Sequence, residues 1–261
     1  ISVGWFLAKR QIKGSNKSTT FLIVFIMMLT FLNLVVVSGI LVGLIEGGSK
    51  ANREQYTGDV IITTLSGNTD IGHTYEIENT LHAMNGISDI SIRYVTIGQI
   101  EANYKTRRDF TEIRDIAGAQ VVGIIPSDEE ALSHISKFVK EGSYLNENES
   151  GYILIGKNLL HRYSEAFGDV FASLDGVYPG DEVKVAIGNN TKTFKVKGII
   201  DSKVDQVSLR AFITKEDFQR LVDRPNLNAN EVAIRISPKS TLTPEDIKAN
   251  LVNAGFTPDG K

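Results

Sequence analysis

The most pronounced hydrophobic pattern in the chain is an uninterrupted apolar run close to its N-terminus. Residues 21–45 contain no charged side chain, and their number exceeds the roughly 18 to 20 apolar residues that distinguish a bilayer-spanning helix from a buried soluble one. At about 1.5 Å per residue the run would form a helix of roughly 37 Å. Because a bilayer core is about 30 Å thick, the pattern predicts a transmembrane helix over residues 21–45.

The charges on either side of this run predict its orientation. Residues 1–20 carry Lys9, Arg10, Lys13 and Lys17 and no acidic residue, and the first carboxylate is Glu46. Lys and Arg near a membrane helix favour the cytoplasmic side. We therefore expect a basic amphipathic segment over residues 1–20 on the cytoplasmic membrane surface, or alternatively a disordered basic leader, with the rest of the chain outside.

A cleaved signal peptide is the alternative interpretation of the apolar run. Its apolar region would span about 7 to 15 residues and end at a small-residue cleavage site. Residues 21–45 are too many, and no such site follows them. The sequence favours an uncleaved anchor.

Small residues within the apolar run suggest that the helix contacts other helices. Gly39 and Gly43 form a G-x-x-x-G pair, and Gly47 continues the same face. Such spacing allows a second helix to approach closely, and the polar Asn33 prefers a partner in another helix to hydrocarbon. The alternative is that glycine is simply common in membrane helices. We predict helix packing at Asn33, Gly39, Gly43 and Gly47.

After Glu46 the pattern changes to short alternating segments, which predict a mixed α+β fold. Helix starts are indicated by capping residues at Ser127, Thr214 and Thr243. The clearest hairpin joins residues 183–187 to 194–196 through Gly188-Asn189-Asn190. The other expected strands are 58–64, two within 88–104, 119–125, 152–155, 207–213 and 231–236, and the other expected helices are 75–85 and 157–167. The charged residues 105–115 are expected to form a solvated loop or the end of a hairpin.

The two ends of the part after the apolar run resemble each other. Residues from 58 and from 230 each give a strand, a polar loop, a helix and a glycine in that order. We therefore expect one discontinuous α+β unit over residues 46–125 and 226–261, with residues 126–225 inserted as a second unit. The second copy stops where its closing strand is expected, which predicts that the chain is a fragment.

Composition adds little specificity. With 261 residues, a net charge of −3 and no cysteine, the chain fits one or two folded units that need no disulfides. That is compatible with a bacterial or archaeal envelope protein. No basic run occurs beyond the N-terminal segment, so nucleic acid is not an expected partner.

No catalytic constellation is visible in the sequence. The four histidines, His73, His82, His134 and His161, are widely spaced and no cysteine supports them, so we expect no metal site. G-x-S-x-G and Walker motifs are absent. Arg107 and Arg108 are better explained by a solvated loop than by an acidic partner. We therefore expect neither an enzyme nor a bound cofactor.

Several short motifs, in this order, resemble the MacB/LolC/FtsX superfamily of ABC transporter permeases. They are I45-E46-G47-G48 at the helix exit, V122-G123-I124, E141-G142, Y152-I153-L154-I155-G156-K157-N158-L159-L160, P179-G180-D181-E182-V183 and F194-K195-V196-K197-G198-I199-I200. Each motif is short, so the resemblance rests on the order in which the motifs occur along nearly the whole chain.

This resemblance implies a four-helix permease subunit whose extracytoplasmic domain lies between its first two helices. A porter-like α+β part (46–125 and 226–261) would be interrupted by a sabre-like part (126–225). It also implies a second permease subunit, a cytoplasmic ABC ATPase, and an envelope adaptor or lipoprotein as a further partner. The chain departs from the pattern because it lacks helices two to four and any ATPase.

We therefore expect a non-catalytic subunit in the inner (cell) membrane that couples ATP hydrolysis by a partner to movement of its outer domain. The substrate would be a lipoprotein, a peptide or a small toxic molecule of the envelope. The alternative is a single-pass anchored extracytoplasmic sensor or binding domain. An anchored hydrolase is disfavoured because no nucleophile and base are visible.

Overall fold

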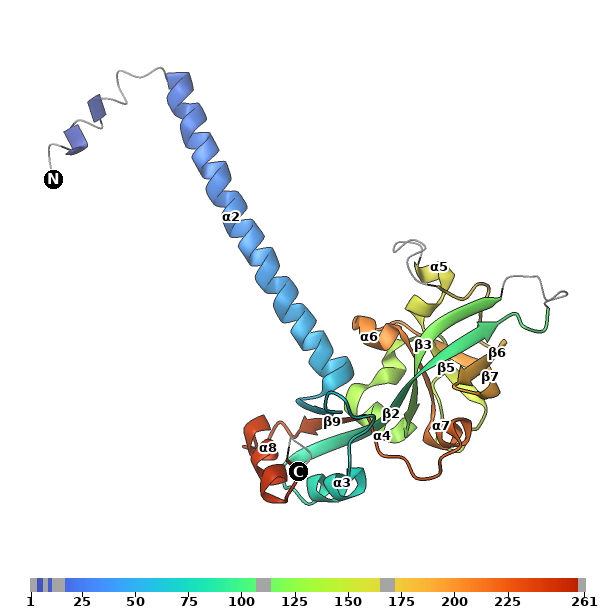
Figure 1. Cartoon of the computed structure of the whole chain (residues 1–261). Coiled ribbons are helices and arrows are strands. Elements are labelled where there is room, and N and C mark those ends of the chain that lie inside the picture. The colour runs from blue at the N-terminus through green and yellow to red at the C-terminus, as the bar shows by residue number, and fades with distance from the viewer. Residues whose placement is uncertain (1–3, 7–8, 11–16, 107–113, 165–171, 258–261) are drawn as a thin grey trace. The chain divides into compact units, whose positions relative to one another are not determined.

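The computed structural model describes residues 4–6, 9–10, 17–106, 114–164 and 172–257. It divides into two compact units, Ile1–Ser49 and Lys50–Lys261. The first unit consists mainly of α2 (Lys17–Asn52), which begins before the predicted span and extends beyond it (Figure 1). None of the described side chains of α2 in the first unit is buried. By length and composition alone, this helix is apolar enough to cross a membrane.

The basic N-terminal segment is described only in part. Residues 4–6 and 9–10 are helical, and the rest of residues 1–16 lies outside the described residues. The amphipathic segment on the membrane surface stays a prediction. Arg107 and Arg108 also lie outside the described residues.

A short π-helix, η1 (Arg53–Thr57), follows α2 in the chain and belongs to the second unit. It ends at Gly58, which has φ 65°. A Cβ atom added to Gly58 would lie 2.4 Å from the Ile234 carbonyl oxygen. Only glycine fits this close approach with a positive φ.

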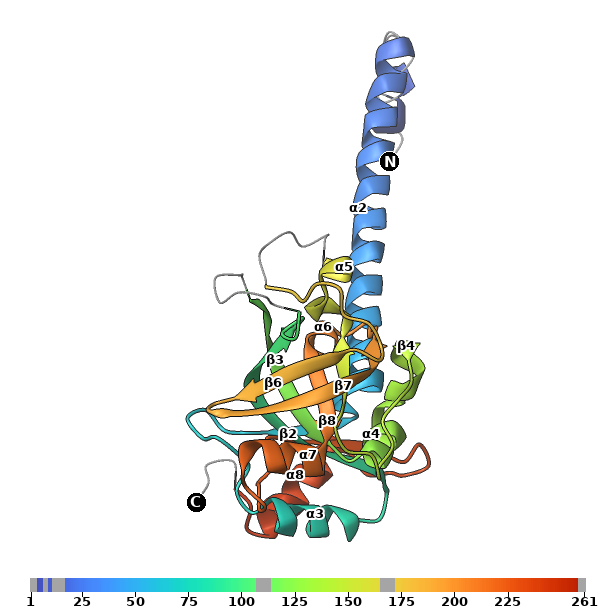
Figure 2. The same ribbon diagram turned by 90° about the vertical axis from the view of Figure 1, so that its right-hand side faces the viewer.

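The second unit is built on a mixed β-sheet that runs through most of it (Figure 2). Within the described residues the strand order is β1-β9-β2-β3-β8-β5-β7-β4, and β6 pairs with β2 and β7. The strands are β1 (Val60–Thr63), β2 (Ile87–Ala102), β3 (Asp115–Ile124), β4 (Val139–Gly142), β5 (Tyr152–Gly156), β6 (Glu182–Ile187), β7 (Asn190–Ile200), β8 (Arg210–Thr214) and β9 (Glu231–Ile236). The predicted hairpin is confirmed as β6 and β7.

Strand β2 joins the two ends of this sheet. It pairs with β9 from Ile87 to Arg93 and with β3 from Tyr94 to Ala102. The sequence-based prediction of two strands here is wrong. Gly98 does not break the strand; it accommodates the Ala186 carbonyl oxygen, which would lie 2.9 Å from an added Cβ.

The helices of the second unit are short. They are α3 (Thr74–His82), α4 (Pro126–Ser133), η2 (Ile135–Phe138), η3 (Lys157–Leu159), α5 (His161–Ser164), α6 (Asp205–Ser208), α7 (Lys215–Val222) and α8 (Pro244–Asn253). The helix predicted over residues 157–167 is divided into η3 and α5, and residues 165–171 lie outside the described residues. The strand predicted from residue 207 begins at Arg210, because α6 buries Val207 and Ser208 first.

Two of the three predicted caps are confirmed. Thr214 accepts a hydrogen bond from the Asp217 N–H, and Thr243 forms a capping box with Asp246. Ser127 is not an N-cap, because Pro126 occupies the first turn and starts α4 earlier.

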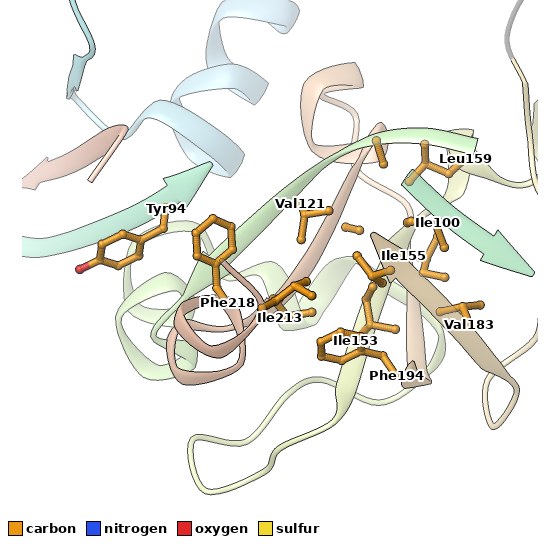
Figure 3. Close-up of a cluster of buried hydrophobic side chains, with 14 of the residues drawn as sticks. Tyr94, Ile100, Val121, Ile153, Ile155, Leu159, Val183, Phe194, Ile213 and Phe218 are labelled. Carbon is orange, nitrogen blue, oxygen red and sulfur yellow. The ribbon is translucent and has the colours of Figure 1, made fainter. Parts of the chain in front are cut away.

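Two hydrophobic clusters stabilise the second unit. In the larger one, α3 and α8 lie side by side against β2 and β9 (Figure 1). Its other part packs Tyr94 against Phe218, with ring centroids 6.3 Å apart, and extends past Ile213 to Ile153, Ile155 and Phe194 (Figure 3). The smaller cluster includes Tyr56 of η1, together with Val122, Ile124, Leu154 and Phe212.

Candidate functional site: a buried ionic cluster at the π-helix

The predicted helix-packing residues all lie in α2. Asn33, Gly39, Gly43 and Gly47 are exposed, and a Cβ atom added at any of the three glycines meets no described atom within 4 Å. The face is therefore open in the described unit. Whether it packs against another helix stays a prediction.

A second candidate site lies in the domain and was not predicted from the sequence. Five residues from five elements bring two arginines, two glutamates and a tyrosine together in the interior. We call this group the π-helix cluster; it consists of Tyr56 (η1), Arg93 (β2), Glu129 (α4), Arg210 (β8) and Glu231 (β9).

The first half of the cluster is an arginine–glutamate pair with almost no exposure. The side chains of Arg93 and Glu129 are 1% and 2% exposed, and Arg93 Nε and Nη2 donate to the two Glu129 oxygens at 2.7 and 2.8 Å. Ser91 and Ser133 each donate a further bond of 2.7 Å to the same carboxylate. Such a two-pronged pair, whose carboxylate also accepts from two serine hydroxyls, is the arrangement in which buried charges are tolerated.

The second half connects β8, β9 and the π-helix. Arg210 donates to both Glu231 oxygens at 2.6 and 3.0 Å, and its Nε donates to Gln120 at 2.9 Å. The Tyr56 hydroxyl donates to Glu231 at 2.9 Å and accepts from Arg210 at 3.1 Å. Its ring lies beneath both guanidinium groups, 5.0 Å from Arg93 and 4.9 Å from Arg210. Tyr56 is therefore held by the two guanidinium cations that face its ring and by the charged groups that bind its hydroxyl.

The electrostatics of the cluster favour its charged state. Burial raises the pKa of the Glu129 carboxyl, but Arg93 and the serine hydroxyls outweigh burial and hold that pKa below its ordinary value. Burial likewise opposes ionisation of Glu231, and bonding to Arg210 lowers the pKa overall. Burial raises the pKa of the Tyr56 hydroxyl. The glutamates are therefore anionic at neutral pH and Tyr56 is a neutral donor.

Further contacts attach the π-helix to its surroundings. The Tyr56 carbonyl accepts from Arg93 Nη2 at 2.8 Å, and the Glu54 carbonyl accepts from Arg235 at 3.2 Å. The Gln55 side chain accepts from Ser202 Oγ at 2.8 Å and from the Lys203 N–H at 3.1 Å. The π-helix is thus bonded to strands β2 and β9 and also to the loop after β7.

A pocket of about 250 Å³ opens beside the cluster. It lies along the part of β2 between Arg93, where pairing with β9 ends, and Gln99, where pairing with β6 begins. Two of its lining residues, Gln120 and Glu231, accept hydrogen bonds from Arg210. The rest of the lining consists of Thr63, Thr64, Val95, Thr96, Ile97 and Asn230.

Sequence reasoning missed the cluster because its members occupy positions that a solvent-facing polar residue also occupies. Arg93 alternates with Ile92 and Tyr94, as on a half-exposed strand, but α4 covers that face and buries it. Glu129 sits in a first helical turn, where the helix dipole explains an acidic residue. Only the pairing of strands far apart in the chain brings these residues together.

The described residues contain no group of three or more His, Asp or Glu side chains placed to hold a metal ion. The π-helix cluster itself consists of arginine and glutamate charges that neutralise each other and of the hydrogen bonds among them. Arrangements of this kind fix one element against another.

No protein-family model matches the chain, and no curated protein sequence matches it. Among solved structures, it is similar to the extracellular domain of the ABC-type transporter YknZ from Gram-positive bacteria, with 13% identity and a TM-score of 0.47 over 76% of this chain and 94% of that one. It is also similar to the periplasmic region of MacB from Actinobacillus actinomycetemcomitans, with 14% identity and a TM-score of 0.45 over 74% of this chain and 80% of that one.

Proposed function

We propose that this chain contributes the first membrane helix and the extracytoplasmic domain of an ABC transporter permease subunit. Residues 21–45 cross the cell membrane with residues 1–20 in the cytoplasm. A partner ATPase hydrolyses ATP on that side, and a second permease subunit completes the membrane unit. The domain moves with the helix and acts on an envelope substrate, such as a lipoprotein, a peptide or a small toxic molecule.

The observation that carries this proposal is the way in which the apolar helix continues into the domain. Helix α2 extends beyond the uncharged run to Asn52 without a break, and the π-helix follows at once. A simple anchor needs only a flexible linker at this point. Here the residues after the helix are instead held by hydrogen bonds to side chains of several strands, among them the buried arginines and Glu231, which suits the transmission of movement.

The pairing of strands supports the two-part organisation of the domain. Strand β9 lies between β1 and β2 in the sheet although it is far from both in the chain, and the three strands would form the porter-like part with α3 and α8. Residues 126–225 would form the sabre-like part, whose strand β8 continues the sheet beside β3. The π-helix cluster takes Arg93 and Glu231 from the first part and Glu129 and Arg210 from the second.

The permease function is tested by uncoupling the helix from the domain. Insertion of Gly-Gly-Ser between Lys50 and Ala51 should leave membrane insertion and folding intact but reduce transport by the full complex to the level obtained with an inactive ATPase. The same insertion between Gly188 and Asn189, in the β6–β7 turn, is the matched control and should leave transport unchanged. Full transport with the first insertion would rule out coupling through this junction.

Orientation and helix packing have separate tests, which the absence of cysteine makes simple. A cysteine at Ser88 should react with a membrane-impermeant maleimide in intact cells, and a cysteine at Lys9 only after permeabilisation. Under oxidation, Gly43→Cys should form a cross-linked dimer, and Leu41→Cys on the opposite helix face should not. The alternative of a single-pass sensor would be favoured if the gene beyond residue 261 encoded no further apolar segments.

A further inference from the structure

We propose that Glu231 has two alternative arginine partners, so that the π-helix cluster is a two-position switch. In the position observed, Glu231 binds Arg210 and Tyr56. In the second position it binds Arg93 Nη1 and releases Arg210. The inference concerns the side chains of the domain and stands whether or not the chain is a permease subunit.

The first observation is an unsatisfied donor at the centre of the cluster. Arg93 uses Nε and Nη2 for Glu129 and the Tyr56 carbonyl, but Nη1 has no hydrogen-bond partner among the described residues. With Arg93 only 1% exposed, bulk water does not satisfy this group. A buried N–H without a partner destabilises the folded protein, and a charged one does so more strongly. A second arrangement that gives Nη1 a partner therefore compensates in part for the hydrogen bonds that it breaks.

The second observation is that Glu231 is the carboxylate placed to satisfy it. The distance from Arg93 Nη1 to Glu231 Oε2 is 3.6 Å, and a hydrogen bond of the usual length would need a shift of only about 0.7 Å. Glu129 stays on Arg93 in both positions, so the change moves one carboxylate between two arginines. The charge of the cluster, two arginines and two glutamates, does not change.

The third observation is the pocket, from which water can solvate Arg210 in the second position. Glu231 and Gln120 both line it, and Arg210 binds both of these side chains in addition to the Tyr56 hydroxyl. When Glu231 turns toward Arg93, water from the pocket can reach the guanidinium of Arg210. Arg210 therefore exchanges a carboxylate for Gln120 and water rather than for an unpaired state.

The two positions differ in how firmly the π-helix is held. In the observed position the Tyr56 hydroxyl bonds with Glu231 and Arg210 together. In the second position Glu231 leaves this group, and Tyr56 keeps its carbonyl bond to Arg93 and its ring contacts. A displacement of the π-helix that pulls Tyr56 from Glu231 would therefore select the second position, because packed interiors convert small shifts into discrete states.

The test is a double-mutant cycle between Arg93→Lys and Glu231→Gln, measured on the whole chain in detergent micelles by denaturant unfolding. In the otherwise unchanged chain the coupling should be weak, below about threefold in the unfolding equilibrium constant, because the two groups share no hydrogen bond. In an Arg210→Gln background it should rise to about tenfold or more, as Glu231 transfers to Arg93. A coupling that is equal in the two backgrounds would overturn the proposal.

Two further variants keep the test decisive. If Arg210→Gln does not fold, Tyr56→Phe removes one donor from Glu231 and should also raise the coupling. Arg220→Gln, an exposed arginine that binds the separate carboxylate Asp217, is the matched control and should leave the coupling unchanged. An equal rise with Arg220→Gln would overturn the switch, as would a crystal structure of the Arg210→Gln chain with an ordered water on Arg93 Nη1 and Glu231 unmoved.

Discussion

Two buried carboxylates of this domain are both paired with cations but differ in how their partners meet water. Glu231 binds Arg210, which is 4% exposed, and lies near Arg93, which is 1% exposed. Asp217 is itself fully buried, but its partners Lys192 and Arg220 are 30% and 61% exposed. The first carboxylate has its cations inside the protein, whereas the second is reached by cations from the surface.

The two groups also differ in how completely their polar atoms are hydrogen-bonded. Asp217 also accepts from Ser150 Oγ and from the Gly151 N–H, and its cationic partners can complete their bonding with water. The π-helix cluster has no such freedom, and it contains the unsatisfied Arg93 Nη1. The Asp217 group therefore anchors a loop to α7 in one arrangement, whereas the π-helix cluster has a reason to rearrange.

The largest effect is expected from Arg93→Met. It leaves the Glu129 carboxylate buried without a cation, and the loss of one partner of a buried pair costs about 3–5 kcal/mol of unfolding free energy. Denaturant unfolding in micelles, followed by near-UV circular dichroism, measures it, because all eight tyrosines lie in the second unit.

A matched variant separates the unpaired charge from lost packing. Arg93→Met combined with Glu129→Met removes both charges and should be less destabilising than Arg93→Met alone. If the single variant lost under about 1 kcal/mol, the pair would behave as a surface ion pair and the comparison with Asp217 would fail.

A smaller loss is expected from Asp217→Asn, which keeps the shape of the side chain but removes its charge. Hydrogen bonds to a charged group contribute about 1.5–3 kcal/mol, and Lys192 and Arg220 can turn to water once the charge is gone. Ser150→Ala is a useful companion, because it removes a single neutral donor and should cost less. A loss for Asp217→Asn equal to that of Arg93→Met would show that exposure of the partners does not matter.

The acid sensitivity of the Asp217 group sharpens the same contrast. Burial raises the pKa of the Asp217 carboxyl, but bonding to Lys192, Ser150 and the Gly151 N–H outweighs burial and leaves that pKa below the ordinary 3.8. A carboxyl with a lowered folded-state pKa stabilises the fold above its unfolded pKa and loses that contribution as the pH falls through the folded value. As the pH falls below about 4, the unfolding free energy should therefore decrease less steeply in Asp217→Asn than in the unchanged chain. Parallel curves of unfolding free energy against pH would contradict this assignment.

The sequence predicted the elements more accurately than the contacts between them. Strand β9 and the caps at Thr214 and Thr243 depend on neighbouring residues, and they were found from alternation and capping chemistry alone. The continuity of β2 is not evident from the sequence, because a glycine such as Gly98 can mark a turn as readily as a close approach to Ala186. Local patterns determine where an element forms, but they do not say what covers it.

The π-helix cluster shows why the candidate site could not be predicted. A polar residue at alternate positions of a strand usually faces water, and Arg93 would do so if α4 did not lie over it. The partners come from residues 56, 129, 210 and 231, so that each contact depends on the whole strand order. The glycines of α2, in contrast, were visible at once, because spacing along one helix needs no tertiary structure.

The smallest effect is expected from Arg220→Gln, which completes the comparison from the exposed side. Arg220 Nη1 donates to Ser150 Oγ at 2.9 Å and to Asp217 at 3.3 Å, but its exposed side chain is already solvated, and exposed ion pairs contribute about 0–1 kcal/mol. Lys192 and the Gly151 N–H continue to satisfy Asp217, so the unfolding free energy should change by less than about 1 kcal/mol. This change should be only slightly larger in low salt than in high salt. A loss as large as that of Asp217→Asn would mean that Arg220 is the essential cation of the group, and that partner exposure does not separate the two buried carboxylates.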